Sequence, residues 1–198
     1  MGRLYLDGLK MILFVMIRPN SAFATIRDND EKYIWWSVSI FGLSFVAFVT
    51  YGYSMPPELN NLLPSITYLT ITYGILSELV FVTLTWLVGR VWGGNPHWRK
   101  VFSVLFCKNI VYILASAIII VMWQSSSFTA GTPWTDSLVA ISLFLPISPL
   151  TIILLGLIIW MIILVIKAIK VVHGFDTGKA VVVGIFSCIP IIAIGVFV

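Results

Sequence analysis

The sequence contains few charged residues. Asp, Glu, Lys and Arg together make up 10% of its 198 residues, whereas apolar residues make up 60%. Such a chain has too few polar side chains to cover a water-soluble core, so the composition excludes an ordinary soluble domain and indicates a membrane protein. The net charge is +4, but the bases form no dense cluster, and we therefore expect no nucleic-acid partner.

Cysteine and histidine are also scarce. Cys107 and Cys188 lie in apolar stretches without metal-type or redox-type spacing, and we interpret them as buried free thiols. His97 and His173 could meet as metal ligands, but two imidazoles without a nearby thiol make a poor site. No nucleophile motif, nucleotide-binding loop or carboxylate pair is evident. We therefore predict no enzyme activity, no cofactor and no metal.

Five apolar stretches are long enough to cross a bilayer as helices, which takes roughly 20 residues each. They cover about residues 33–54, 66–92, 101–123, 138–166 and 180–198. Helices are required because lipid offers no hydrogen-bond partner to a free backbone group. The sequence therefore predicts an all-α integral membrane protein, with a five-helix membrane domain over 33–198 and a cytoplasmic segment over 1–32.

The basic residues fall in alternate gaps between these stretches. The N-terminal segment, the second gap with its approach and the fourth gap hold all of them except Lys108. The first and third gaps hold only acids, Glu58 and Asp136. This alternation follows the positive-inside rule. It places the N-terminus in the cytoplasm and, after five spans, the C-terminus outside, and a plasma membrane is expected if the chain is prokaryotic.

Prolines divide the fourth and fifth stretches. Because a proline removes a backbone donor, Pro146 and Pro149 predict a separate segment over 138–145 and a span that begins near Pro149. Pro190 is expected to interrupt the last span in the same way. Such a break either kinks a helix for packing or marks the substrate site of a transporter.

The N-terminal segment predicts two short helices. Charged and apolar side chains separate onto opposite faces of the first, which is typical of an amphipathic helix at a membrane interface. Arg18 and Pro19 end this helix. A second helix follows, with Asn20 or Ser21 as its cap.

The second and fourth gaps carry turn signals. Gly93-Gly94 permits a tight turn with positive φ. Asp176 or Thr177 is placed to cap the last helix.

Glu78 and Lys108 lie deep inside the second and third apolar stretches. A charge at the centre of a transmembrane helix costs about 2.5 to 3.5 kcal/mol on insertion scales, so it normally has a partner. Measured from the cytoplasmic helix ends, the two depths differ by only about 6 Å. We therefore predict an ion pair between the small, polar face of the second span and the face of the third that holds Lys108 and Tyr112. The pair either pins two helices together or belongs to a proton or ion relay, or a hydrophilic groove.

Three predicted cytoplasmic segments resemble the Yip domain family, the five-span membrane proteins that interact with Ypt/Rab GTPases. The matching pieces are Ile17-Arg18-Pro19-Asn20-Ser21-Ala22-Phe23, Gly93-Gly94 with Arg99, and His173-Gly174-Phe175-Asp176-Thr177-Gly178-Lys179-Ala180. The resemblance covers about residues 12–195. It implies an N-cytoplasmic five-helix bundle and, for eukaryotic members, work in vesicle trafficking. Those members look longer, with an acidic tail and an Asp-Leu-Tyr-Gly-Pro motif that this chain lacks. It is similar to the compact prokaryotic form, and a small GTPase is not the partner we expect.

Two functional hypotheses follow. The first is a non-enzymatic scaffold or adaptor in the lipid bilayer, active in membrane organisation or trafficking, whose cytoplasmic face binds a protein partner, lipid headgroups or another copy of the chain. The candidate face consists of Arg18, Pro19, Gly93, Gly94, Arg99, His173 and Lys179. The alternative is a small transporter, channel or lipid-moving protein with a groove at Glu78 and Lys108.

Overall fold

The computed structural model describes residues 2–53, 63–127 and 149–197, and all regular structure in these ranges is helical. The elements are α1 (Gly2–Ile17), α2 (Pro19–Asp28), α3 (Asp30–Tyr53), α4 (Leu63–Val91), α5 (Trp98–Phe106), the 3₁₀ helix η2 (Cys107–Asn109), α6 (Ile110–Ser127), α8 (Pro149–His173) and α9 (Thr177–Phe197). The predicted all-α fold class is confirmed for these residues.

Within the described ranges, three segments are long and apolar enough to cross a membrane: Gly74–Val91 in α4, Trp98–Ile118 from α5 into α6, and Ile152–His173 in α8. Thr177–Pro190 in α9 is a shorter apolar helix. Many large apolar side chains on α8 and α9 are exposed, which suits contact with lipid and not with water. The total of five spans and the orientation of the chain in the membrane stay predictions.

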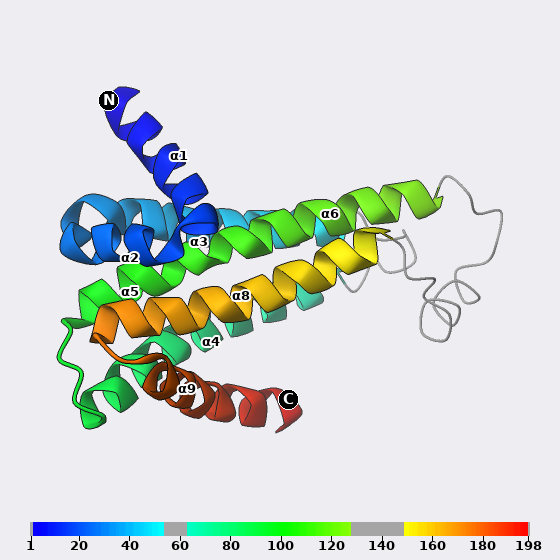
Figure 1. Cartoon of the computed structure of the whole chain (residues 1–198). Coiled ribbons are helices and arrows are strands. Elements are labelled where there is room, and N and C mark those ends of the chain that lie inside the picture. The colour runs from blue at the N-terminus through cyan, green and yellow to red at the C-terminus, as the bar shows by residue number, and fades with distance from the viewer. Residues whose placement is uncertain (1, 54–62, 128–148, 198) are drawn as a thin grey trace.

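The long helices α3, α4, α6 and α8 run side by side in an elongated bundle (Figure 1). α9 packs chiefly against α4 and α8, and α2 packs against α8 and α5. α1 projects from the bundle at a steep angle, with its C-terminal end next to the other helices (Figure 1), and it contacts α2 and η2. The N-terminal segment therefore packs against the bundle and does not merely precede it in the sequence.

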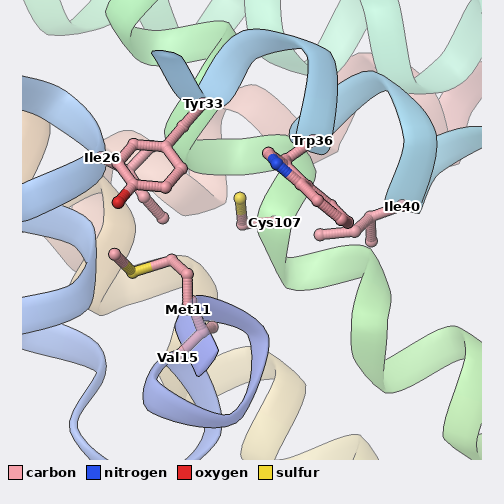
Figure 2. A pocket seen from close by; sticks show the side chains of 7 residues that line it. All are labelled: Met11, Val15, Ile26, Tyr33, Trp36, Ile40 and Cys107. Atoms are coloured by element: carbon pink, nitrogen blue, oxygen red, sulfur yellow. The ribbon is translucent and has the colours of Figure 1, made fainter. Parts of the chain in front are cut away.

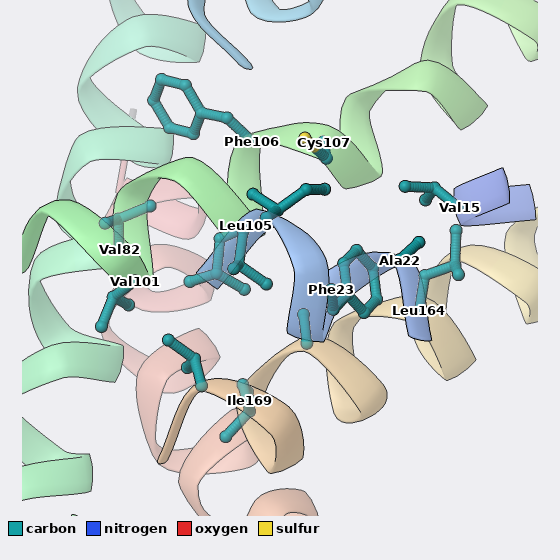
Figure 3. Packing of buried hydrophobic residues seen from close by; sticks show 14 of the residues in the cluster. Val15, Ala22, Phe23, Val82, Val101, Leu105, Phe106, Cys107, Leu164 and Ile169 are labelled. Carbon is teal, nitrogen blue, oxygen red and sulfur yellow. The ribbon is translucent and has the colours of Figure 1, made fainter. Parts of the chain in front are cut away.

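The buried core lies where α2 meets α5 and α8 (Figure 3). Phe23 and Ile26 of α2, Leu105 of α5 and Leu164 and Ile169 of α8 have no exposed surface. These side chains belong to one apolar cluster. α2 is thus held by its buried face, and its position does not depend on a membrane surface.

α1 is attached to the bundle by apolar contacts. Met11 and Val15 of α1 face Cys107 and the first turns of α3 (Figure 2), around a void of about 10 Å³. This volume is at the lower limit for one water molecule, and its lining is mostly apolar. Asp7 and Lys10 are exposed. The predicted interfacial position of α1 stays a prediction.

The break between the first two helices lies where the sequence predicts it, but the cap differs. α1 ends at Ile17 and α2 begins at Pro19. The first backbone N–H groups of a helix have no acceptor within it, so proline, which lacks an N–H, loses no hydrogen bond at this position. Arg18 is the N-cap residue and makes no side-chain cap hydrogen bond. Asn20 and Ser21 lie inside the first turn, so the prediction that they cap the helix was wrong.

Two glycines in the left-handed region end α4 and α8. Gly93 has φ of +92° and Gly174 has φ of +71°. After Gly93, the N–H of Gly94 donates to the carbonyl of Gly89 at 2.9 Å, and Phe175 makes the equivalent bond after Gly174 at 3.0 Å. These are the six-to-one bonds of Schellman motifs. The predicted positive-φ turn at Gly93 is confirmed.

The prolines act differently in α8 and α9. α8 begins at Pro149, as expected, and continues to His173. α9 continues through Pro190, so the predicted interruption there was wrong; neighbouring helices and small backbone adjustments let apolar helices accommodate a proline. Pro146 and residues 138–145 lie outside the described residues.

Asp176 caps α9 and makes its stability depend on pH. Its Oδ1 accepts a hydrogen bond from the N–H of Lys179 at 2.9 Å, as predicted. That bond lowers the pKa of Asp176 below its usual value of 3.8. The carboxylate is the bonded form, so the stabilisation is present above pH 3.8 and is lost as the pH falls through the lowered pKa.

We expect Asp176→Ala to lower the thermal stability of the detergent-solubilised protein at neutral pH. The difference from the wild type should shrink in acid, where the wild-type carboxyl is protonated. Thermal unfolding followed by circular dichroism at both pH values measures this. Asp176→Asn is the control, because its amide oxygen accepts the same bond at any pH. Equal stability of Asp176→Ala and the wild type at neutral pH would contradict the prediction.

Candidate functional site

Glu78 of α4 and Lys108 of η2 lie in direct contact inside the bundle. Lys108 Nζ donates to the two carboxylate oxygens of Glu78 at 2.7 and 2.9 Å, and to Asn109 Oδ1 at 3.1 Å. Only 4% of the Lys108 side chain and 17% of the Glu78 side chain are exposed. An ammonium group has three donors, so these three acceptors satisfy it completely. The sequence predicted the two charged partners but missed Asn109, which no spacing argument singles out.

The chain around Lys108 departs from a regular α-helix. Cys107–Asn109 form a 3₁₀ turn between α5 and α6. Such a turn has 3.0 residues per turn, so it changes the rotation of α6 relative to α5. Cys107 contacts Ser37 of α3, with Sγ and Oγ 3.3 Å apart. The turn therefore carries side chains that contact α3 and α4.

Two aromatic rings flank the ammonium group of Lys108. Its Nζ lies 5.5 Å from the ring centroid of Phe81 and 5.7 Å from that of Tyr112. Both distances are within the range of cation–π interactions. The charge is thus surrounded by acceptors and π faces instead of water.

A cavity of about 620 Å³, which we call the ion-pair groove, opens beside this pair. Ser77, Glu78, Lys108 and Tyr112 supply its polar edge. The rest of the lining is Phe81 of α4, Met161, Ile162, Val165 and Ile166 of α8, and Val181, Gly184, Ile185, Cys188 and Ile189 of α9. The ion pair bridges the two faces that the sequence predicted to meet, and α8 and α9 form the other walls. The volume is typical of small-molecule sites.

His173 holds the turns after α4 and α8 together. A Cβ atom on Gly89 or Gly94 would overlap its imidazole ring, so both positions require glycine. The ring is 8% exposed and stacks on Phe175 with centroids 5.1 Å apart. Neither ring nitrogen has a hydrogen-bond partner. His173 therefore acts through its shape, as a packing element between two turns.

Arg27 and Arg99 attach α2, α3 and α5 to the same end of the bundle. Arg27 Nη1 donates to the carbonyl of Val171 at 2.9 Å, at the C-terminus of α8, where the helix dipole favours a cation. Arg27 Nε lies 2.8 Å from Asp28, and this hydrogen bond lowers the pKa of Asp28. Arg99 Nε lies 3.4 Å from Asp30. We call the surface formed by residues 27–31, 92–100 and 173–179 the polar end.

The structure does not bring all residues of the predicted candidate face together on one surface. Gly93, Arg99 and Lys179 lie at the polar end and are at least partly exposed, whereas Gly94 and His173 are buried there. Pro19 is buried, and Arg18 is exposed at the opposite end of α2 from Asp28. α2 has ten residues, which corresponds to about 15 Å.

This division corrects the predicted face. Pro19, Gly94 and His173 are buried and support the fold from inside, where a partner cannot contact them. Arg18 lies outside the polar end, at the other end of α2.

His97 does not join His173 as a metal ligand. It is exposed at the N-cap of α5, where its Nδ1 accepts a hydrogen bond from the N–H of Arg99 at 3.3 Å. Within the described ranges, no cluster of three or more His, Cys, Asp or Glu residues is arranged to hold a metal ion.

The family model of the Yip1 domain matches residues 13–198, nearly the whole chain. This range includes both the ion-pair groove and the polar end.

The chain belongs to the Yip1 domain family.

The resemblance in the three predicted cytoplasmic segments is confirmed, and this Yip1 domain is an integral membrane protein. Comparison with curated proteins and with solved structures gives no match. The structure shows the roles that several residues of the resemblance play in the fold of this Yip1 domain. Phe23 is in the core, Gly94 and His173 join two turns, and Asp176 caps α9.

We expect Gly89→Ala to destabilise this Yip1 domain by about 1 to 3 kcal/mol, because the added methyl group overlaps the His173 ring. The double variant Gly89→Ala, His173→Ala should lose less than the sum of the single losses, since the smaller side chain at 173 makes room. Unfolding by denaturant in detergent micelles measures these free energies. Gly42→Ala in α3 is the control, because a Cβ there meets nothing within 4 Å. Additive losses would contradict the packing role of His173.

We expect Glu78→Gln and Lys108→Met each to lower the free energy of unfolding by about 3 to 5 kcal/mol, because each leaves one buried charge without its partner. The double variant removes both charges and should be more stable than either single variant. The same denaturant measurement applies. Asp7→Asn, which breaks the exposed pair with Lys32, should have little effect because water screens that pair. A Lys108→Met variant as stable as the wild type would contradict a structural role for the pair.

Proposed function

We propose that this Yip1 domain protein is a non-enzymatic scaffold or adaptor of the plasma membrane, and that its polar end binds a protein partner on the cytoplasmic side. The supporting observation is the assembly of the polar end. Three segments that are far apart in the sequence form one surface there, held by His173 against Gly89 and Gly94 and by Arg27 on Val171.

A preassembled surface favours binding. A partner that meets fixed side chains loses less conformational entropy on association than one that must order a loop. At the polar end both turns are closed by backbone hydrogen bonds, and α9 begins with a side-chain cap. The backbone between these fixed points is therefore held in place.

The charges at the polar end have both signs. Glu31 and Asp28 are exposed next to Arg99 and Lys100, and Asp176 is exposed beside Lys179. Mixed charges select a partner by complementary pairs and do not attract every polyanion. This pattern favours a specific protein over a nucleic acid, and it does not single out a small GTPase.

Among the residues that the structure describes, the ion-pair groove is what favours the alternative transport hypothesis. All three donors of Lys108 already have acceptors, so the groove presents no free cationic group to a passing substrate. The scaffold role is therefore the function that we propose.

Crosslinking in native membranes, followed by quantitative mass spectrometry, tests the scaffold role. We expect a near-stoichiometric partner of the wild type to be reduced about tenfold or more by Glu31→Ala with Lys179→Ala, a loss of about 1.4 kcal/mol in binding free energy. Glu31 is 86% exposed and Lys179 is also exposed, so the fold should persist.

The matched control is Asp7→Ala with Lys10→Ala on α1. It also removes one exposed acid and one exposed base, neither of which belongs to the polar end; Asp7 pairs with the exposed Lys32. An equal loss in both double variants would attribute association to general charge. Full retention in the polar-end variant would refute the proposed surface.

A further inference from the structure

The ion-pair groove opens toward lipid. Ile162 of α8 and Ile185 and Ile189 of α9 line it, and each is more than half exposed. Both helices carry apolar exposed surface along the segments that are suited to a membrane. The molecules that reach this opening are therefore those dissolved in the bilayer.

The ion pair at the edge of the groove lies at the depth of the hydrocarbon core of a bilayer. The segment from Glu78 to Val91 of α4 corresponds to about 20 Å at 1.5 Å per residue. Leu87 and Val91 are exposed, so the apolar surface of α4 continues to its end. The ion pair then lies well inside a hydrocarbon core that is about 30 Å thick. A phosphate or ammonium headgroup would lose its hydration at that depth, which is costly.

The ion pair at the polar edge of the groove accepts hydrogen bonds and has no free ammonium donor. The three donors of Lys108 are used by Glu78 and Asn109. Each carboxylate oxygen of Glu78 has two lone-pair directions, and its bond to Lys108 uses one. The pair is neutral overall, so a ligand with a net charge would be left uncompensated. A neutral hydroxyl group meets these conditions, whereas a ligand that only accepts hydrogen bonds gains nothing from the pair.

The remaining walls suit a hydrocarbon chain. α8 and α9 supply mostly branched aliphatic side chains to these walls. The volume of about 620 Å³ is far larger than one water molecule requires. An apolar cavity of this size beside one polar cluster is typical of sites for amphiphilic ligands.

We propose that the ion-pair groove binds a neutral lipid with a free hydroxyl group, of the diacylglycerol class. The hydroxyl donates to Glu78, beside the phenol of Tyr112, and an acyl chain lies along α8 and α9. This inference goes beyond the scaffold role and does not depend on it, since it concerns the membrane-embedded half of the chain and not the polar end.

Photolabelling of the purified full-length protein in phosphatidylcholine nanodiscs tests the proposal. Three probes carry the same diazirine-bearing acyl chain: a diacylglycerol, its O-methyl ether, and a phosphatidylcholine. We expect labelling of α8 and α9 groove peptides by the diacylglycerol to exceed labelling by each other probe about tenfold. The ether isolates the hydroxyl group without any change to the protein.

A matched pair of variants locates the site. Ile162→Trp fills the groove and should reduce diacylglycerol labelling by about fivefold or more, which corresponds to roughly 1 kcal/mol. Ile159→Trp is the control, since Ile159 lies about one turn earlier on α8 and does not line the groove. Ile162 is 52% exposed and Ile159 is 60% exposed, so the two positions are similarly accessible. If Ile162→Trp fails to fold, the comparison of the diacylglycerol with its ether still decides the outcome.

Three results would overturn the proposal. Equal labelling by all three probes would mean that the groove holds ordinary bilayer lipid. Equal labelling of the wild type and a folded Ile162→Trp variant would place the lipid elsewhere. Labelling by none of the three probes on groove peptides of the folded wild type would show that the groove takes up no lipid from the bilayer.

Discussion

The buried ammonium group of Lys108 determines the geometry around it. Hydrocarbon offers no water to replace a missing acceptor, so α4 must supply Glu78 and the chain must place Asn109 beside the same Nζ atom. Lys108 and Asn109 are both placed by the 3₁₀ turn Cys107–Asn109. Because two long side chains separate the backbones of α4 and η2 at this level, space remains beside them. The ion-pair groove is a consequence of satisfying this one charge.

Close backbone approach organises the other end of the molecule. At Gly89 and Gly94 the absence of a side chain admits the His173 ring, and the left-handed conformations of Gly93 and Gly174 reverse the chain on either side. A polar group is thus buried without a hydrogen bond, which is unfavourable by itself. The packing of both turns against the ring is what offsets that cost, and it fixes α8 and α9 relative to α4.

Much of this arrangement could be predicted from local sequence, and the exceptions have a common reason. Charges in apolar stretches predicted the contact of Glu78 with Lys108, and turn residues predicted Gly93 and the cap at Asp176. Cys107–Asn109 have long apolar runs on either side, so the sequence pattern gave no sign of the 3₁₀ turn. Arg27 and Val171 are 144 residues apart, and no periodicity relates them. Contacts between distant segments were therefore the part that only the folded chain could supply.

The groove and the polar end share two helices. α8 lines the groove with Ile162 and Ile166 and reaches the polar end at His173, and α9 does the same from Gly184 to its cap. A ligand in the groove that displaces α8 from α4 would have to move the His173 ring away from Gly89, and dense packing resists such a shift. Occupancy of the groove and the arrangement of the polar end are therefore constrained by the same contact.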